Sequence, residues 1–234
     1  MAASETAMSA VAASETAMSA VAASETAMIS IISEEKARET FFGSKYKVGL
    51  GLATYAKINN SALKGCNTIS LVAASSTAMQ AVAASSTAMQ AVAASSTAMQ
   101  AVAASSTALN AIVKVVSACQ AIVTNISTYR SQILSALSSG NEFTKTTGQQ
   151  VGNGNTTVDH GLNTNTIYIP TSCQDDGDTD MAAYSGVNQT TQIVSVGRHN
   201  GETAVNTGVA LRGVKVVGTG SSVGYFKFDI YTAK

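Results

Sequence analysis

A repeat of ten residues constrains the structure of this chain more than any other feature of its sequence. The segment AASETAMSAV begins at Ala2, recurs at Ala12 and starts again at Ala22, and a sister segment, VAASSTAMQA, begins at Val72, Val82 and Val92. Copies this similar indicate a spacer whose length they set, because residues with individual chemical roles would differ from copy to copy. We therefore expect the functional residues to lie outside the repeats.

The larger apolar side chains of the second array are spaced as on one face of an α-helix. Alternating steps of seven and three residues separate Val72, Met79, Val82, Met89 and Val92. A strand would need a period of two, which is absent, and Ala, Met and Gln favour helix. A disordered Ala/Ser/Thr-rich linker is the alternative, but the regular placement of Val and Met argues against it.

After the last clean copy, the apolar spacing changes to the three-and-four pattern of a coiled coil. The seam consists of Leu109, Ile112, Val116, Cys119, Val123, Ile126, Ile133 and Leu137, with Arg130 as its one interruption. One continuous helix over residues 71–138 would be a rod of roughly 100 Å at a rise of about 1.5 Å per residue. Such a helix needs a partner for its apolar face, so we predict self-association into a homotrimeric coiled-coil stalk.

Between the two arrays, residues 33–70 break the repeat and hold much of the charge and aromatic content of the N-terminal half. We predict a small folded element here, in which Phe41, Phe42 and two tyrosines form a local cluster or a docking surface. In an alternative arrangement the N-terminal array, residues 1–32, folds back on the second array within one chain. The sequence leaves that alternative open.

The charge composition argues against nucleic acid as a partner. Charged residues make up 12% of the chain and 14 basic groups balance 14 acidic ones, whereas a surface that binds nucleic acid is basic. The stretch from Gly65 to Val113 carries no charge, which raises the question of a membrane span. Each ten-residue unit there holds two Ser, one Thr and one Gln, which is too polar for a spanning helix, so we expect no membrane insertion.

The cysteines give no indication of a bound group. Cys66, Cys119 and Cys173 are three in number and show no CxxC spacing, so the sequence predicts neither a disulfide framework nor a zinc site. We expect reduced thiols and no cofactor.

Residues 151–234, which follow a linker at 139–150, have the pattern of an all-β domain. Short runs such as NTIYIPT and VGYFKFDIYTA alternate with Gly, Asn and Asp clusters, a spacing typical of a sandwich. In the last run, Phe226, Phe228 and Ile230 alternate with more polar residues, which places them on the buried face of a strand. The predicted fold class is therefore α+β, an elongated helical stalk with a C-terminal sandwich-like β-domain.

Ala/Ser/Thr-rich decads, a heptad stretch and a β-domain containing TVDHGLNTNTIYIP occur together in this chain. In this combination, and in the pattern of Val158, His160, Gly161, Leu162 and Pro170, the sequence resembles the fibre proteins of tailed bacteriophages. The resemblance implies a homotrimer in the virion, assembled in the host cytoplasm, with other virion proteins and a host cell-surface receptor as partners. The chain is short and begins with repeats rather than with a recognisable attachment domain, so tail, collar and head positions all stay open.

Three tyrosines of the β-domain are candidates for surface recognition, namely Tyr168, Tyr184 and Tyr225. A tyrosine offers a large apolar ring and a polar hydroxyl, which suits contact with a receptor, although burial in the sandwich is an equally good interpretation.

Four carboxylates in the sequence QDDGDTD form a weak candidate for a Ca²⁺ site, namely Asp175, Asp176, Asp178 and Asp180. Carboxylates this close repel one another unless water or a cation separates them, and Ca²⁺ prefers oxygen ligands. Their spacing does not match an EF-hand loop, and a solvated loop is the alternative.

Two short matches to catalytic motifs lack the context that catalysis needs. GSSVG would make Ser222 a nucleophile, but a β-run follows it and no histidine lies downstream. SALK, from Ser61 to Lys64, matches S-x-x-K without its companion motifs. We therefore predict no catalytic residues and no enzyme.

The sequence thus predicts a structural fibre protein that presents its β-domain on a helical stalk for attachment to a host surface. The alternative is a capsid, collar or tail decoration protein that anchors to the particle and binds no receptor. A hydrolase is the third hypothesis, and it would need a carboxylate pair or a triad that the sequence does not supply.

Overall fold

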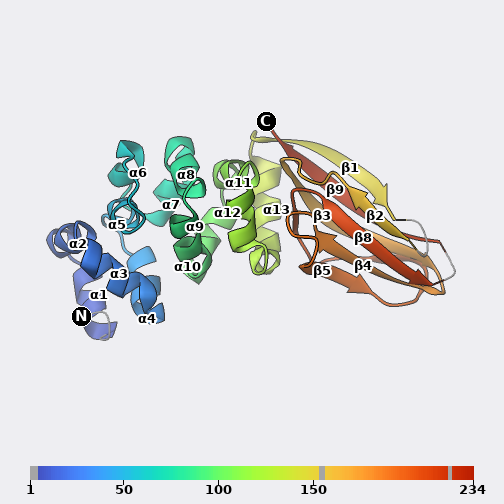
Figure 1. Ribbon diagram of the computed structural model, residues 1–234, viewed down its shortest axis with the longest axis horizontal. Coiled ribbons are helices and arrows are strands. Elements are labelled where there is room, and N and C mark those ends of the chain that lie inside the picture. The colour runs from blue at the N-terminus through green and yellow to red at the C-terminus, as the bar shows by residue number, and fades with distance from the viewer. Residues whose placement is uncertain (1–4, 153–155, 221–222) are drawn as a thin grey trace. The chain divides into compact units, whose positions relative to one another are not determined.

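The computed structural model describes residues 5–152, 156–220 and 223–234 (Figure 1). Helices form the first part of the chain and strands the second, which confirms the mixed α+β class. The chain divides into two compact units, Met1–Ala121 and Ile122–Lys234. We call them the helical unit and the β unit and describe each by itself.

The helical unit consists of short helices that follow one another closely. They are α1 (Glu5–Ala12), α2 (Glu15–Ala22), α3 (Glu25–Ser33), α4 (Glu35–Phe42), α5 (Val48–Tyr55), α6 (Ser61–Gly65), α7 (Ile69–Ala74), α8 (Ser76–Ala83), α9 (Ser86–Ala93), α10 (Ser96–Ala103), α11 (Ser106–Val113) and α12 (Val116–Ile122). In the repeats, each decad forms one helix, of eight residues except in α3, which has nine, and a short corner separates it from the next helix.

In the decads whose corners the structure describes, a serine ends the helical path and starts the next helix. Ser85 has extended backbone angles (φ −104°, ψ 111°), and its hydroxyl accepts a hydrogen bond from the N–H of Ala88 at 3.2 Å. Ala84, just before it, donates its own N–H back to Gln80 O of the preceding helix at 3.0 Å. Ser is a preferred N-cap residue because its side chain satisfies an otherwise unpaired backbone donor. The repeat therefore encodes a corner as well as a helix.

The prediction of one continuous coiled-coil helix over residues 71–138 is wrong. Seven separate α-helices, α7 to α12 and α13 (Arg130–Ser139), and one 3₁₀ helix, η1 (Ile126–Tyr129), occupy this segment. The spacing of Val and Met correctly indicated helix within each decad. The serine between decads nevertheless competes with helix continuation, because its side chain caps a new helix start.

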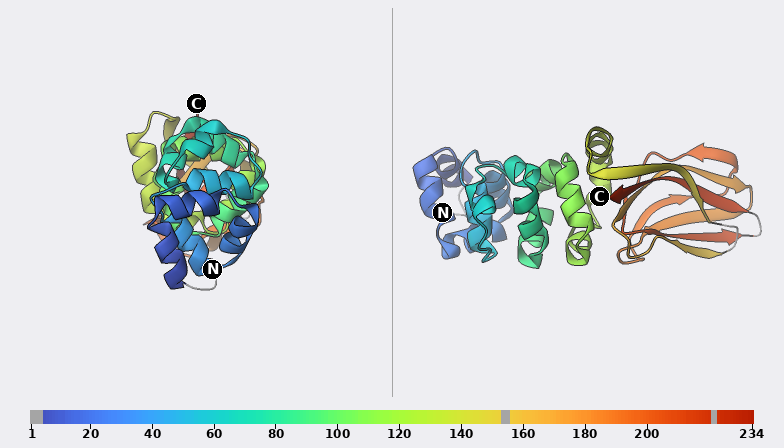
Figure 2. Two further views of the ribbon diagram at one scale, coloured as in Figure 1. Left: turned by 90° about the vertical axis from the view of Figure 1, so that its left-hand side faces the viewer. Right: turned by 90° about the horizontal axis from the view of Figure 1, so that it is seen from above.

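The apolar face of each decad points into the helical unit. Met79 and Val82 are fully buried, as are the equivalent Met and Val residues of the next two decads. Helices pack on the third helix along the chain, α1 on α4, α2 on α5, α7 on α10 and α8 on α11. Three helices therefore make one superhelical turn, and Figure 2 shows these helices along their stacking direction and from above.

Serine hydroxyls also tie one superhelical turn to the next. Ser44 donates to Ala12 O at 3.1 Å, and Ser105 donates to Ala73 O at 2.7 Å. Both pairs are 32 residues apart in sequence, close to the 30 residues of three decads.

The segment 33–70 forms one turn of the same stack, through α4, α5 and α6. Phe41 and Phe42 are buried, with ring centroids 5.1 Å apart in an edge-to-face arrangement. A side chain on Gly49 would place Cβ 1.9 Å from Leu63 O, so only glycine allows this approach of α5 and α6. The N-terminal array packs on this segment.

Ion pairs join the first superhelical turn to the second. Glu15 lies 3.5 Å from Lys47 Nζ, and Glu25 lies 2.8 Å from Lys57 Nζ. Each pair spans 32 residues, as the serine bonds do. The first array has Glu where the second array has Ser, and two of these glutamates pair with lysines of the neighbouring turn.

The corner between α9 and α10 is held by α4. Arg38 Nε donates to Ala94 O, at the C-terminus of α9, at 3.1 Å. The Glu39 carboxylate accepts from the backbone N–H groups of Ser96 at 2.9 Å and Thr97 at 3.0 Å, at the N-terminus of α10. A cation at a helix C-terminus and an anion at an N-terminus both complement the helix dipole.

The β unit holds one 3₁₀ helix, one α-helix and two sheets (Figure 1). The helices are η1 (Ile126–Tyr129) and α13 (Arg130–Ser139), and the strands are β1 (Phe143–Val151), β2 (Thr157–His160), β3 (Thr166–Asp176), β4 (Thr179–Ser185), β5 (Gln192–Val196), β6 (Asn200–Ala204), β7 (Ala210–Leu211), β8 (Val214–Gly220) and β9 (Gly224–Ala233). One sheet has the order β1-β9-β3-β6, with β7 also paired to β3, and the other has the order β2-β8-β4-β5. The strand pairs among the described residues are all antiparallel.

Side chains from both sheets form a single core. Phe226 and Phe228 of β9 are fully buried, together with Cys173 of β3, Met181 of β4 and Val216 of β8. The alternation predicted for β9 is therefore confirmed, and the two sheets pack as a sandwich.

Helix α13 and η1 lie against the five-stranded sheet of the same unit. The guanidinium of Arg130 donates to Pro170 O at 2.6 Å and lies 3.4 Å from Val205 O, and Ser127 Oγ accepts from Val209 N at 3.0 Å. Arg130 interrupts the apolar pattern of the sequence because it binds strand backbone.

Candidate functional site

The residues expected to form a trimer seam are buried within one chain, with one exception. Leu109, Ile112, Cys119, Val123, Ile126, Ile133 and Leu137 are at most 5% exposed, whereas Val116 is 43% exposed. They belong to several helices in both units and therefore do not form one stripe on one helix. This seam leaves no continuous apolar surface for partner chains.

The HGL motif has a structural role in the turn between β2 and β3. His160 Nδ1 lies 2.8 Å from the hydroxyl of Tyr168. Gly161 has φ +60°, and a Cβ there would lie 2.2 Å from the same hydroxyl. Arg212 donates to Asn165 Oδ1 at 2.8 Å, which fixes the rest of the turn.

Tyr168 is therefore not available for surface recognition. Its side chain is 2% exposed and packs edge-to-face on Phe228, with ring centroids 5.7 Å apart. Burial raises the pKa of its hydroxyl. Tyr184 and Tyr225 remain as candidates for surface recognition.

The acidic cluster binds an arginine of its own chain. Arg198 lies 3.2 Å from a carboxylate oxygen of Asp178 and 3.7 Å from one of Asp180. Asp175 is buried and Asp176 is exposed. Within the described ranges, no three His, Cys, Asp or Glu side chains come together in a way that could hold a metal ion, so the weak Ca²⁺ candidate is not supported.

The outer surface of the five-stranded sheet gathers polar side chains around Tyr225. The Tyr225 hydroxyl donates to Gln174 Oε1 on the neighbouring β3. Lys227 lies over the Tyr225 ring, with Nζ 6.0 Å from the centroid, and binds Glu202 on β6 at 2.9 Å. We call these four residues, with Ser172, the Tyr225 face.

The Tyr225 face is held by regular strands. Gln174 lies opposite Tyr225 on one side and opposite Glu202 on the other, so β9, β3 and β6 each contribute to one surface. The Ser172 hydroxyl and Lys227 hydrogen-bond to Glu202 and lower the pKa of its carboxyl. The arrangement offers a ring, an amide and a charge pair to a partner, without a catalytic geometry.

The sequence singled out Tyr225 but missed Ser172, Gln174 and Glu202. These residues lie up to 53 positions from Tyr225 in the chain. The register of the paired strands brings these residues beside Tyr225, and the local pattern of apolar residues does not predict that register. Tyr184 lies on β4 in the other sheet, where it alternates with the core residues Met181 and Ala183.

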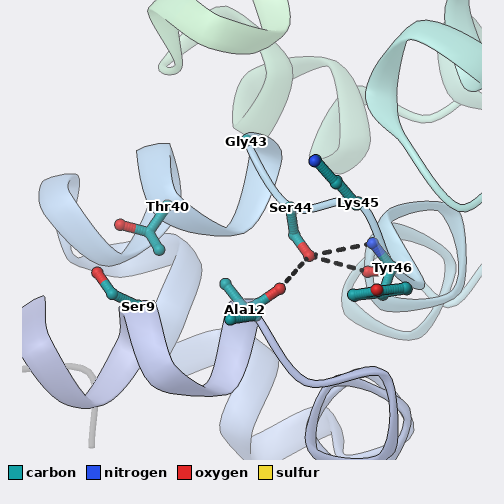
Figure 3. Close-up of a pocket in the computed structure, with 8 residues that line it drawn as sticks. Ser9, Ala12, Thr40, Gly43, Ser44, Lys45 and Tyr46 are labelled. Carbon is teal, nitrogen blue, oxygen red and sulfur yellow. Dashed lines mark hydrogen bonds between the residues drawn. The ribbon is translucent and has the colours of Figure 1, made fainter.

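The helical unit has its own hollow, beside Ser44 (Figure 3). It has a volume of 510 Å³ and is lined by Ser9, Ala12, Ala13, Thr40, Gly43, Ser44, Lys45 and Tyr46. Ser44 Oγ is engaged there with Ala12 O and with the backbone of Tyr46. The hydroxyl therefore serves the packing of two turns.

The short catalytic matches gain no support from the geometry. Lys64 Nζ donates to Asn59 Oδ1 at 2.9 Å. Ser222 lies outside the described residues, so the structure does not bear on it.

Among the described residues no single helix is long and apolar enough to span a membrane, although α2 and α3 together meet the criteria of length and composition, with a bend of 99° between them.

The chain is thus a repeat protein in which a stack of ten-residue helical repeats is followed in sequence by a β-sandwich. Comparison with protein-family models and with curated proteins gave no match.

Proposed function

We propose that this chain is a non-catalytic fibre protein of a bacteriophage virion, with the helical unit as a spacer and the β unit as the part that binds a host surface. The observation that carries the proposal is the modular construction of the helical unit. Each decad supplies its own serine corner and packs on the third helix along the chain. The likeness of the sequence to phage fibres supports the same assignment.

Uniform modules suit a spacer because they add length without adding new kinds of contact. In repeat proteins each unit contacts mainly its neighbours, so stability is close to a sum of unit and interface terms. The exposed positions of the second array are Ser, Thr, Gln and Ala. Such a surface is soluble and carries little information for recognition.

The Tyr225 face is the surface we propose for host attachment. Tyrosine is enriched at binding surfaces, whereas lysine and glutamate are depleted there, so the Tyr225 ring is the proposed anchor and the polar groups around it are its rim. Tyr225 and Lys227 stand on the central part of the sheet, flanked by Gln174 and Glu202. The proposed partner is a cell-surface receptor, and other virion proteins would hold the opposite part of the chain.

We keep association of three chains as part of the proposal, since three copies of a weak site on one particle bind more tightly than one. The association would use a surface other than the expected seam, because that seam is buried in each chain.

The test is binding of the fluorescently labelled full chain to bacterial envelopes and to purified tailed phage particles. We expect envelope binding that Tyr225→Ala reduces at least tenfold and that the matched control Tyr184→Ala leaves unchanged. Circular dichroism of both variants checks that the fold persists. Binding to particles alone would favour a decoration protein, and breakdown of envelope polysaccharide would overturn the non-catalytic assignment.

A further inference from the structure

His199 lies in the turn between β5 and β6 with a carbonyl oxygen at each ring nitrogen. Nδ1 is 3.0 Å from Gly197 O, and Nε2 is 3.2 Å from Cys173 O on β3. A carbonyl oxygen only accepts hydrogen bonds, and a neutral imidazole carries a proton on one nitrogen only. Both contacts are hydrogen bonds only when the ring is protonated on both nitrogens.

A buried carboxylate lies beside the same turn. Asp175 is 0% exposed, and its Oδ2 accepts from the N–H groups of Thr179 at 3.2 Å and His199 at 3.3 Å. Its Oδ1 is buried and has no hydrogen-bond partner among the described residues. A polar group removed from water is costly unless hydrogen bonds satisfy it, and the backbone N–H groups of Thr179 and His199 supply two to this carboxylate.

The other ionisable groups around the turn are engaged or neutral. Arg198 pairs with Asp178 and Asp180 at the β3–β4 turn, and Glu202 of β6 pairs with Lys227. Asp176 is exposed and lies opposite Asn200 in the sheet. Burial and the neighbouring Asp175 raise the pKa of the Cys173 thiol to about 12, so this thiol stays neutral near pH 7.

We propose that His199 is a proton-controlled latch on the edge strand β6. With the ring protonated, Nδ1 donates to Gly197 O within the β5–β6 turn and Nε2 donates to Cys173 O, which ties the turn to β3. When the ring loses a proton, one bond is lost and two acceptors face each other. Strand β6 is the outer strand of its sheet and is exposed along its whole length, so its start is the part that opens.

The latch acts in the range in which histidine side chains change their charge, between about pH 5 and 8. It bears on binding because β6 carries Glu202 of the Tyr225 face. The inference itself rests on the geometry of His199 and is independent of the proposed function.

The test uses the full chain with ¹⁵N-labelled histidine, followed by NMR between pH 5 and 8. The chain has two histidines, and His199→Gln identifies the signal of each. We expect the His199 ring to pass from two protonated nitrogens to one. Over the same range, amide protection of residues 197–203, corrected for the intrinsic rate, should fall about fivefold, as for loss of one hydrogen bond.

The variant His199→Gln should show the low protection of residues 197–203 at every pH. Three outcomes overturn the latch: a ring that stays in one protonation state throughout, protection that does not follow the ring, or a pH response that persists in His199→Gln. If that variant fails to fold, the titration of the unaltered chain alone decides, because ring and amides are followed in one sample.

Discussion

Glu39 and Thr97 lie 58 residues apart in sequence, and two hydrogen bonds join them. The carboxylate oxygen Oε2 accepts from the Thr97 backbone N–H at 3.0 Å and from its hydroxyl at 2.7 Å. Burial acts to raise the pKa of Glu39, but hydrogen bonds from Thr97, Ser95 and Ser96 outweigh it, and the pKa lies below its ordinary value. A side chain of the second superhelical turn thus caps a helix of the second repeat array.

Glu39→Gln should therefore destabilise the helical unit by about 1 kcal/mol, because an amide binds the helix N-terminus less strongly than a carboxylate does. The measurement is the free energy of unfolding in urea at pH 7. Glu35→Gln, at the exposed N-terminus of the same helix, is the control and should cost less, because it loses only the dipole contribution of α4 and no contact with α10.

The Glu39 contribution should depend on pH with a definite sign. A carboxyl whose pKa is lower in the folded state stabilises the fold above its unfolded pKa, and this stabilisation is lost as pH falls through the folded value. The difference between the unaltered chain and Glu39→Gln should thus be full above about pH 5 and disappear in more acidic solution. A difference that grows on acidification would contradict the carboxylate contacts.

The burial of the expected seam predicts opposite results at two of its positions. Ile112→Glu should unfold the helical unit, because a charge replaces a fully packed side chain at a cost of several kcal/mol, about 3 or more. Val116→Glu, at an exposed position, should change stability by less than about 0.5 kcal/mol. Thermal melting followed by circular dichroism measures both. If sedimentation velocity showed that Val116→Glu abolishes an oligomer of the unaltered chain, the result would support the coiled-coil seam.

The contact of Gly161 with Tyr168 predicts a coupled pair of substitutions. Gly161→Ala should destabilise the β unit by about 2 kcal/mol, because the backbone is left-handed and the new methyl group meets the Tyr168 hydroxyl. Tyr168→Phe removes that hydroxyl. The double variant should recover part of the loss, which a double-mutant cycle in urea would measure as a coupling energy. Strict additivity would sink the steric explanation.

Arg130→Met should loosen α13 from the sheet it contacts. The variant keeps the aliphatic stem and loses the donors to Pro170 O and Val205 O, at a cost of about 1 to 3 kcal/mol. Hydrogen exchange should quicken in α13 and leave the core strands β3 and β9 slow. In Arg130→Lys, which keeps the charge and one donor nitrogen, the exchange rate in α13 should lie between those of the unaltered chain and of Arg130→Met. Uniform exchange throughout the β unit in Arg130→Met would show that α13 and the sheet open as one body.

Local patterns in the sequence were enough to predict elements but not their connections. The spacing of Met79 and Val82 gave the helix face, and the alternation around Phe226 and Phe228 gave the last strand. The corner at Ser85 was missed because the spacing of apolar residues does not reveal a helix cap, and the residues around this serine favour helix. The heptad pattern misled because steps of three and four also fit short helices that pack on one another.

The candidate site was less predictable than the fold. Tyr168 and Tyr225 look alike in sequence, and only the packing of the first against Gly161 and Phe228 places it inside the sandwich. Gln174 and Glu202 reach Tyr225 through strand pairing over long sequence separation. Pairing of that kind follows from the packing of the whole unit.

The charge pairs between the first two superhelical turns have a consequence for how this chain can vary between relatives. A duplication or loss of one uncharged decad of the second array carries its own corner with it and leaves like surfaces in contact. The first array behaves in the same way at its two identical decads, which begin at Ala2 and Ala12: after loss or duplication of one of them, a glutamate still lies 32 residues before Lys47 and before Lys57. The charge pairs therefore fix the distance between each glutamate and its lysine, while the number of decads before them can change.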